Sequence, residues 1–433
     1  MNTHTTTRTE ADTQTLRSFL VHMDKKGKVV HIPESVSSIY EAPKRSATTD
    51  DILLFNKVDD EEGGVHHVVM NLLATHASLA DAVGVPEKKL VSHLAGYSYQ
   101  GTVVEGDPLV CSEVNLNALP IMRHFPLDAG RYITAGVVFS EYGGSANASV
   151  HRMLVQGKDR LVARLVEGRH THALLSSAIA AKERLPVAIA IGLHPLVLYA
   201  ACCRVPPEKE LPFAAELLGG TLTVRRLSNG VRVPDAEIIL EGYIVPELFA
   251  EGPFVDITGT YDPVRMQHGI ELCGIWTKPD PIYHGILPAG AEHKLLMGAP
   301  YEPLIYRSVA QVTGVTDVVL TKGGGGYLHA VVQIKKRTEG DGKNAIMAAF
   351  AAATSLKHVV IVDQDINIQD PLDVEFAIAT RVRADQDLMI ISGVRGSSLD
   401  PARIGDGLNV KMGIDATMPL GKEDEFLRAG WSD

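Results

Sequence analysis

The chain has 433 residues, of which 45% are hydrophobic and 21% are charged. These fractions are close to those of ordinary globular proteins and exclude a wholly disordered chain, a collagen and a coiled coil. Acidic residues outnumber basic ones by 52 to 41, and the formal net charge of −11 argues against a nucleic-acid partner. The 4 cysteines form no C-x-x-C pair, which predicts a reducing, cytoplasmic environment and no disulfide framework or zinc cluster.

The beginning of the sequence predicts neither a secretion signal nor a membrane anchor. Residues 1–15 are rich in threonine and lack an apolar stretch, so we expect a disordered tail there. The longest apolar stretch, 185–203, is interrupted by Pro186, His194 and Pro195. A buried strand over 187–193 and a helix that begins at Pro195 explain it better than a membrane span, because proline is favoured in the first turn of a helix.

The next elements in chain order are one helix and then a run of strands. Residues 72–83 have helical spacing, and Gly84 and Pro86 follow as a stop. The middle third alternates apolar and polar residues and is rich in β-branched side chains, with a turn at Gly143 and Gly144. Many strands with few long helices favour a barrel or an antiparallel sheet here. The expected strands cover residues 131–140, 149–156, 161–166, 221–227 and 237–243.

The last third changes character. A strand over 328–335, an alanine-rich helix over 344–356 and an apolar strand over 357–362 form a βαβ pattern, which predicts a parallel sheet. A domain boundary near 300–304 fits this change. We therefore expect an α/β multidomain chain, with an N-terminal α/β region, a central domain and a C-terminal α/β domain, at residues 16–115, 116–303 and 304–433 respectively.

The densest polar cluster on a strand-like background is the segment 147–152. Alternation along a strand puts Asn147, Ser149 and His151 on one face and Arg152 on the other. The segment 168–172 follows a strand and contains an H-x-H pair, which can share a metal but is a weak signal by itself. Hydrogen-bonded or exposed histidines without any ligand are the structural alternative.

Two carboxylates, Glu251 and Asp256, flank a Gly-Pro turn. Carboxylates held close together push their pKa values apart, as acid–base chemistry requires, although a solvated turn is the alternative. The acidic run 363–367 begins like a calcium loop but lacks the required Gly and Glu, so we place it at the end of a strand. The glycines at 323–326 lack the Lys-Ser/Thr of a phosphate-binding loop. No serine-hydrolase, zincin or dinucleotide motif is present.

These segments, in this order, resemble the UbiD-type decarboxylases that depend on prenylated FMN. The resemblance covers about residues 100–415, and although each segment alone is weak, the ordered set is highly specific. The matching segments are 128–134, 147–153, 168–170, 210–215, 237–242, 251–256, 280–284, 362–365 and 411–417.

The resemblance implies a flavin-binding split β-barrel in the centre and a C-terminal domain that forms a homodimer or larger homo-oligomer. The cofactor would be prenylated FMN, supplied by a separate flavin prenyltransferase. Its phosphate would be held through a divalent ion, usually Mn²⁺, with K⁺ nearby on main-chain carbonyls around 200–204. Asn147, His170 and Glu210 match the metal ligands, and amide, imidazole and carboxylate donors suit such an ion. The implied cofactor contacts are Asn147, Ser149, Arg152, Met153, Arg169, His170, Glu210 and, less securely, Lys357.

The resemblance also assigns catalysis to Arg152, Glu251 and Asp256. Loss of CO₂ from an sp² carbon leaves a carbanion that side chains cannot support, so an electron-sink cofactor is needed, and the family reacts through a covalent substrate–cofactor adduct. Arg152 would orient the substrate carboxylate, Asp256 would deliver the proton, and Glu251 would position both. Many members have Glu in place of Asp256.

The implied reaction is the reversible, non-oxidative decarboxylation of an α,β-unsaturated or (hetero)aromatic monocarboxylic acid. Residues 282–303 resemble the heteroaromatic-acid branch, where the residue matching His293 lies near the substrate ring. Tyr301 stands where dicarboxylate-handling relatives have Arg, and a second buried carboxylate would lack a partner. Archaeal members that act on an isoprenoid phosphate share the Asn-x-Ser-x-His-Arg and Gly-Arg-His segments, so a phosphorylated enoate is the alternative. Two further alternatives are a non-catalytic flavin-binding subunit and a globular protein whose polar core residues only pair with one another.

Overall fold

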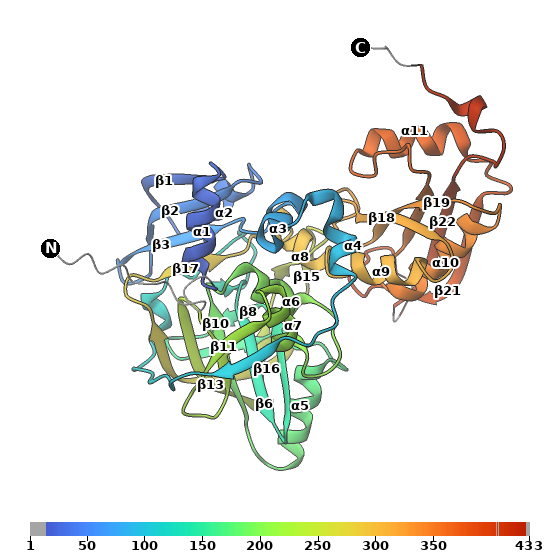
Figure 1. The fold of residues 1–433 in the computed structure, drawn as a ribbon. Coiled ribbons are helices and arrows are strands. Elements are labelled where there is room, and N and C mark those ends of the chain that lie inside the picture. Colours follow the sequence, from blue (N-terminus) through green and yellow to red (C-terminus); the bar gives the residue numbers. More distant parts are fainter. Residues whose placement is uncertain (1–13, 404, 406, 430–433) are drawn as a thin grey trace. The chain divides into compact units, whose positions relative to one another are not determined.

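The computed structural model describes residues 14–403, 405 and 407–429 of the chain (Figure 1). Of the tail expected at residues 1–15, residues 1–13 therefore lie outside the described residues. Helix α1 (Leu16–Lys25) begins where folding was expected, with the Thr15 hydroxyl accepting from the Ser18 main-chain N–H. None of the helices in the described ranges is both long and apolar enough to cross a membrane.

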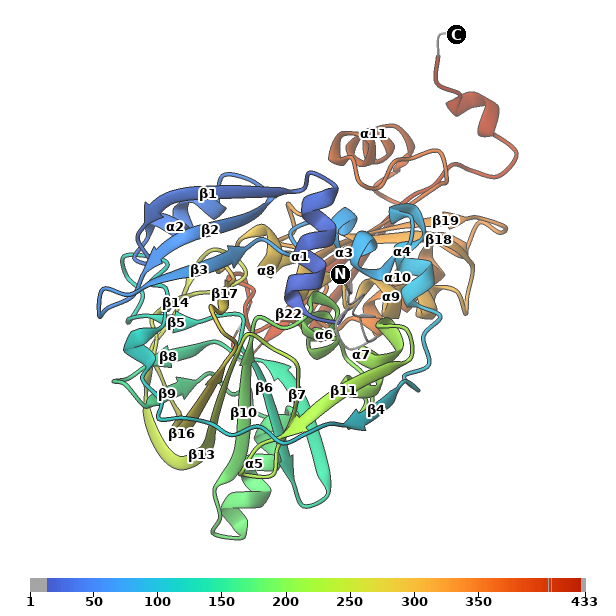
Figure 2. The same cartoon turned by 60° about the vertical axis from the view of Figure 1, so that its left-hand side comes forward.

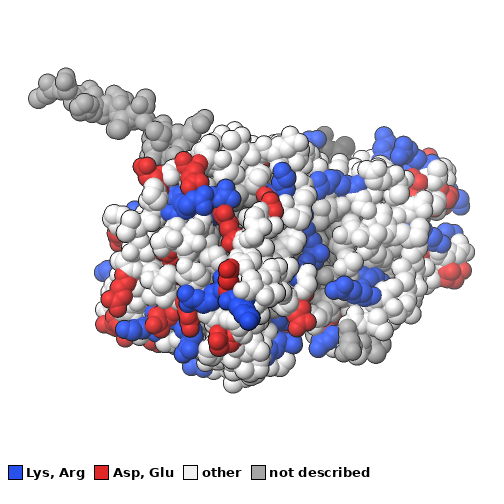
Figure 3. Space-filling view, turned by 90° about the horizontal axis from the view of Figure 1, so that it is seen from below, with Lys and Arg blue, Asp and Glu red and all other residues white. Residues whose placement is uncertain are grey.

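The structure is a mixture of helices and several sheets, as predicted, and it divides into two compact units. The first contains Met1–Gly84 and Tyr97–His293, and the second contains Val85–Gly96 and Lys294–Asp433. On the face shown in Figure 3, basic and acidic side chains are interspersed, with no extended field of one sign.

The first unit begins with a sheet in the order β1-β2-β3-β17. Strand β17 comes from much later in the chain and pairs parallel to β3. Helix α1 packs Leu16, Phe19 and Met23 against this sheet, and α3 follows β3. Helix α3 ends at Gly84, whose φ of +80° favours glycine, so the predicted stop is confirmed. The elements are β1 (Val29–Val36), α2 (Glu41–Ser46), β2 (Ile52–Asp59), β3 (Val65–Met70), α3 (His76–Val83) and β17 (Ile282–Gly285).

An eight-stranded antiparallel sheet forms the centre of the first unit, in the order β5-β8-β9-β16-β13-β10-β6-β7 (Figure 2). The predicted antiparallel sheet is thus confirmed, and Gly143 and Gly144 make the turn between β6 and β7 with φ of +61° and +85°. The expected strands 131–140 and 149–156 each cover parts of two strands, and 221–227 forms a strand of a smaller sheet instead. Among the described strands, β5 and β7 are not paired with each other, so the sheet does not close. Its strands are β5 (Tyr132–Ile133), β6 (Val137–Tyr142), β7 (Ser145–Val150), β8 (Met153–Val155), β9 (Arg160–Ala163), β10 (Leu185–Ile191), β13 (Ile238–Glu251) and β16 (Arg265–Thr277).

In the described part of the first unit, three further helices and two small sheets surround these strands, and helix α8 (Ala291–Gly298) begins at its C-terminal end. The apolar stretch around Pro195 folds as predicted, with strand β10 followed by a helix that has proline at its start. The helices are α5 (His170–Ala180), α6 (Pro195–Cys202) and α7 (Glu210–Leu217), with the short helix η3 (Leu116–Ala118). The small sheets contain β4 (Thr102–Glu105), β11 (Thr221–Arg226) and β12 (Arg232–Pro234), and β14 (Phe254–Val255) with β15 (Tyr261–Asp262).

The second unit is built on one sheet in the order β18-β19-β20-β22-β21. Strands β19 and β20 are parallel and joined by helix α10, so the predicted βαβ unit is confirmed. The acidic run follows the end of β20, as expected, and Asp363 and Asp365 pair there with buried Arg381. The elements are η2 (Glu87–Lys89), α4 (Leu90–Leu94), α9 (Glu302–Val309), β18 (Gly314–Leu320), β19 (His329–Lys335), α10 (Asp341–Ala352), β20 (His358–Val362), α11 (Pro371–Arg381), β21 (Leu388–Arg395), β22 (Leu408–Ala416) and η4 (Glu423–Phe426).

Candidate active site

The segment 147–152, which covers the end of strand β7 and the two residues after it, directs its polar side chains to two different groups of partners, in line with the predicted alternation. On one face, the Asn147 amide nitrogen donates to the Ser149 hydroxyl at 3.0 Å, and that hydroxyl lies 2.9 Å from His151 Nε2. Just beyond the strand, Arg152 turns the other way and meets a group of carboxylates. One short segment thus supplies two chemically different sites.

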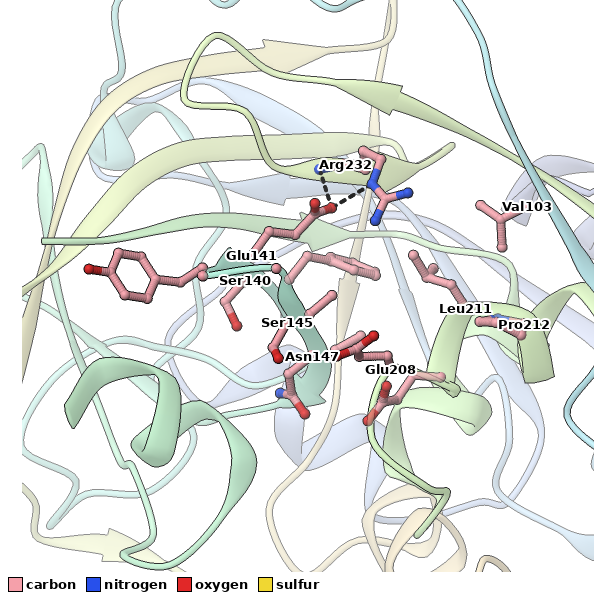
Figure 4. Close-up of a pocket in the computed structure, with 16 residues that line it drawn as sticks. Val103, Ser140, Glu141, Ser145, Asn147, Glu208, Leu211, Pro212 and Arg232 are labelled. Atoms are coloured by element: carbon pink, nitrogen blue, oxygen red, sulfur yellow. Dashed lines mark hydrogen bonds and ion pairs between the residues drawn. The ribbon is translucent and has the colours of Figure 1, made fainter. Parts of the chain in front are cut away.

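The three candidate metal ligands come from three elements of the first unit. Asn147 lies on β7, while His170 and Glu210 are the first residues of α5 and α7. His170 Nδ1 lies 3.8 Å from Glu210 Oε1. Asn147 and Glu210 line the same cavity of about 430 Å³, where Figure 4 shows Asn147 on the hairpin facing the segment of Glu208 and Leu211. Glu141 and Arg232 form an ion pair of 2.7 Å in the wall of this cavity.

The donor groups of this set fit a divalent cation. Burial, with a smaller effect from the charge of Glu208, raises the pKa of Glu210 to about 7 against the opposing effect of a backbone hydrogen bond. The Asn147 side-chain oxygen accepts no hydrogen bond from any described residue, since both contacts of that side chain are made by its nitrogen. An ion bound to these oxygens would satisfy both. The described residues contain no group of three His, Cys, Asp or Glu side chains that could bind a metal. The candidate set is of a different kind, because its third donor is the amide of Asn147.

Arg152 is surrounded by three carboxylates. Its Nε and Nη2 donate to the two oxygens of Glu251, both at 2.9 Å. Nη1 donates to Asp256 at 3.0 Å, and Nη2 also donates to Asp262 at 2.8 Å. The side chains of Glu251, Asp262 and Asp256 are 0%, 9% and 21% exposed, so Asp256 is the carboxylate of the three most accessible to solvent.

Within this cluster, hydrogen bonds and opposite charges outweigh the effect of burial on the pKa values. Burial alone would lower the pKa of Arg152, but the hydrogen bonds and charges of Glu251, Asp256 and Asp262 raise it above its ordinary value. Burial would raise the pKa of Asp262, yet its bonds to Arg265 and Arg152 lower it. Four of the five guanidinium N–H groups of Arg152 are used, which leaves one N–H on Nη1 for a bound anion.

The other predicted residues are distributed over both units. In the first, Met153 is fully buried in the core, and Arg169 is exposed at the residue before α5. His293 accepts a hydrogen bond from the Ala289 N–H through Nδ1 at 3.0 Å. Lys357 and Tyr301 belong to the second unit. Lys357 pairs there with Asp400 at 2.9 Å, and the Tyr301 ring packs edge-on to Tyr327.

Two residues of these clusters were not singled out from the sequence. Thr171 contacts Asn147, Ser149 and His151, and its only sequence signal is its position directly after His170. Asp262 reaches Arg152 from β15, and a lone acidic residue on a two-residue strand gives no sequence signal.

Models of one protein family match almost the whole chain. The N-terminal, Rift-related and C-terminal domains of 3-octaprenyl-4-hydroxybenzoate carboxy-lyase match residues 20–97, 102–291 and 294–416. The chain therefore belongs to the UbiD family, as the sequence segments indicated. It is a carboxy-lyase, and its activity is decarboxylation.

Individual relatives extend this assignment. The anhydromevalonate phosphate decarboxylase of Methanosarcina mazei is 53% identical over 96% of this chain and 99% of its own length. The solved structure of the UbiD-class enzyme HmfF from Pelotomaculum thermopropionicum in complex with FMN has a TM-score of 0.92 at 35% identity, covering 96% of this chain and 97% of that one. An evolved dimeric form of HmfF in complex with prenylated FMN has a TM-score of 0.87 at 34% identity, with the same coverage.

Proposed function

We propose that this chain decarboxylates a phosphorylated isoprenoid enoate and uses prenylated FMN to do so. The observation that carries the substrate class is the likeness to anhydromevalonate phosphate decarboxylases, which reaches 53% identity over nearly the full length of both chains. Others of the same name, from Methanocaldococcus jannaschii and other archaea, also match at 41–54% identity. A phosphorylated enoate was the alternative to a heteroaromatic acid, and these relatives favour it.

The proposal includes the groups that hold the cofactor. Asn147, His170 and Glu210 would bind Mn²⁺ or another divalent ion, which would in turn hold the cofactor phosphate, and carbonyls around 200–204 would bind K⁺. The buried carboxylate of Glu210, with its pKa raised to about 7, supports a cation at this position. A separate flavin prenyltransferase would supply the cofactor. The dimeric form of HmfF supports a homo-oligomer.

Prenylated FMN, when bound, supplies the electron sink for the electron pair left behind by CO₂. The chain's own residues orient the substrate and move the proton. The remaining Nη1 N–H of Arg152 would bind the substrate carboxylate, because Glu251 and Asp262 hold the guanidinium in one orientation. Asp256 would take a proton from solvent and deliver it to the substrate carbon, since it is the most exposed of the three carboxylates.

A substrate comparison tests the proposal. The chain is produced together with a flavin prenyltransferase and assayed for CO₂ release from three acids: anhydromevalonate phosphate, its dephosphorylated form and furan-2-carboxylate. We expect turnover of the phosphorylated acid and at least tenfold lower kcat/KM for the other two. Preference for furan-2-carboxylate would overturn the substrate class, and a colourless protein that is inactive on all three would overturn the cofactor assignment.

The proton donor is tested by Asp256→Asn. The amide keeps the size of the side chain but has no acidic proton, so we expect decarboxylation to fall by about 10²–10⁴-fold. Solvent-deuterium exchange into the product, followed by mass spectrometry, should fall in parallel. Undiminished exchange would mean that another group delivers the proton.

A further inference from the structure

A closed hydrogen-bond network lies behind Asn147, and neither its histidine nor its threonine has a role in the proposed function. Asn147 Nδ2 contacts the hydroxyls of Ser149 and Thr171 at 3.0 and 2.9 Å. His151 Nε2 contacts the same two hydroxyls at 2.9 and 3.2 Å, and the hydroxyls are 3.0 Å apart. Two hydroxyls therefore separate the histidine ring from the amide.

The main chain fixes the direction of this network. His151 Nδ1 lies 3.0 Å from the carbonyl oxygen of Arg164, and because a carbonyl only accepts, Nδ1 must carry a hydrogen. Burial lowers the pKa of His151, which keeps the ring neutral with a single N–H. Nε2 is therefore an acceptor, and it takes a hydrogen from one of the two hydroxyls.

A count of hydrogens then decides which way the Asn147 amide points. With its nitrogen toward the hydroxyls, the amide contributes two hydrogens and the hydroxyls two more, which makes four for the five contacts. With its oxygen toward the hydroxyls, only two hydrogens remain for the same five contacts. The first arrangement is strongly preferred, and it directs the amide oxygen away from the network.

We propose that His151 and Thr171 are positioning residues that present the Asn147 oxygen, rather than its nitrogen, to the divalent cation. The inference rests on the cation site of the proposed function and adds the two residues that orient one of its ligands. An amide nitrogen cannot ligate a cation, so the orientation decides whether Asn147 is a ligand at all. Partners that orient metal ligands in this way typically contribute 10–100-fold to metal affinity.

The test measures Mn²⁺ binding to the full chain produced without flavin prenyltransferase, with free Mn²⁺ followed by electron paramagnetic resonance. We expect His151→Phe and Thr171→Val each to weaken binding by about 10–100-fold. Thr171→Ser keeps the hydroxyl and should bind like the wild type. His268→Phe is the matched control, because His268 Nδ1 also bonds a main-chain carbonyl, that of Val245, at 3.1 Å, but His268 contacts no hydroxyl among the described residues.

A double-mutant cycle separates orientation from general damage. In Asn147→Asp both side-chain oxygens can ligate, so the direction of the network no longer matters, and adding His151→Phe should weaken Mn²⁺ binding less than threefold further. A loss as large as in the wild-type background would overturn the inference, as would wild-type affinity in both single variants. If the wild-type chain itself binds no Mn²⁺, the cation site of the proposed function fails instead.

Discussion

Two groups of side chains lie close together in the sequence, one around Asn147 on strand β7 and one around Arg152 just after it. They differ in how well the charged side chains are paired within the protein. The guanidinium of Arg152 is fixed by three carboxylates, and the chain needs nothing further to hold it there. In the set of Asn147, His170 and Glu210, burial disfavours the charged form of the Glu210 carboxyl and raises its pKa to about 7. The comparison teaches that the chain itself fixes the orientation of Arg152, whereas burial disfavours the charged form of Glu210.

The largest effect is expected for Arg152→Ala. Removing the guanidinium takes away the ion-pair partner of Glu251 and Asp256 and leaves Asp262 with Arg265, which costs about 3–5 kcal/mol of unfolding free energy and abolishes turnover. Denaturant unfolding and CO₂ release measure the two effects. Arg152→Lys is the control that keeps the charge but loses the planar fork. An active and stable Arg152→Ala variant would contradict the importance of this arginine and its carboxylate partners.

Glu210→Gln is expected to stabilise the metal-free protein, whereas Arg152→Ala destabilises it. The pKa of Glu210 is raised from 4.5 to about 7, so its contribution to stability is present below pH 4.5 and is lost as the pH rises through 7. At pH 8 the ionised carboxyl therefore costs on the order of 1–3 kcal/mol, and Gln should recover most of it. Thermal unfolding with and without Mn²⁺ measures this, and Mn²⁺ should stabilise the wild type more than the variant. A less stable metal-free variant would contradict the comparison.

The same carboxyl predicts how Mn²⁺ binding depends on pH. Proton and metal compete for Glu210, so affinity should be constant above its pKa of about 7 and should fall by up to tenfold per pH unit below it. Titrations of the wild type between pH 5.5 and pH 8, in steps of about half a unit, measure the slope. Flat binding over this range would mean that Glu210 is not a ligand.

The smallest effect is expected for Asp262→Asn. Glu251 still binds Nε and Nη2 of Arg152, so the guanidinium keeps its orientation, and the loss should be about 1–2 kcal/mol of stability. Turnover should fall by no more than about tenfold, in line with that energy. Asp81→Asn, which removes a surface carboxylate paired with Lys26 and Lys28, is the control and should change neither.

The sequence predicted local structure better than long-range contacts. The helix at Pro195, the turn at Gly143 and the βαβ unit depend on neighbouring residues, so pattern alone was sufficient. Arg152 meets Glu251 and Asp256 across 99 and 104 residues, and only the family resemblance connected them. Asp262 could not be found in either way, because a carboxylate on a short strand has no periodicity and no motif.

The last strand of the first sheet, β17, has a consequence for synthesis of the chain. Because β17 pairs with β3, the edge of β3 stays open until residue 285 has left the ribosome. Open edges are where chains pair wrongly with one another, and a late partner lengthens that exposure. A nascent chain halted before residue 282 should therefore aggregate, although it already contains Arg152, Glu251 and Asp256, for which we propose the catalytic roles.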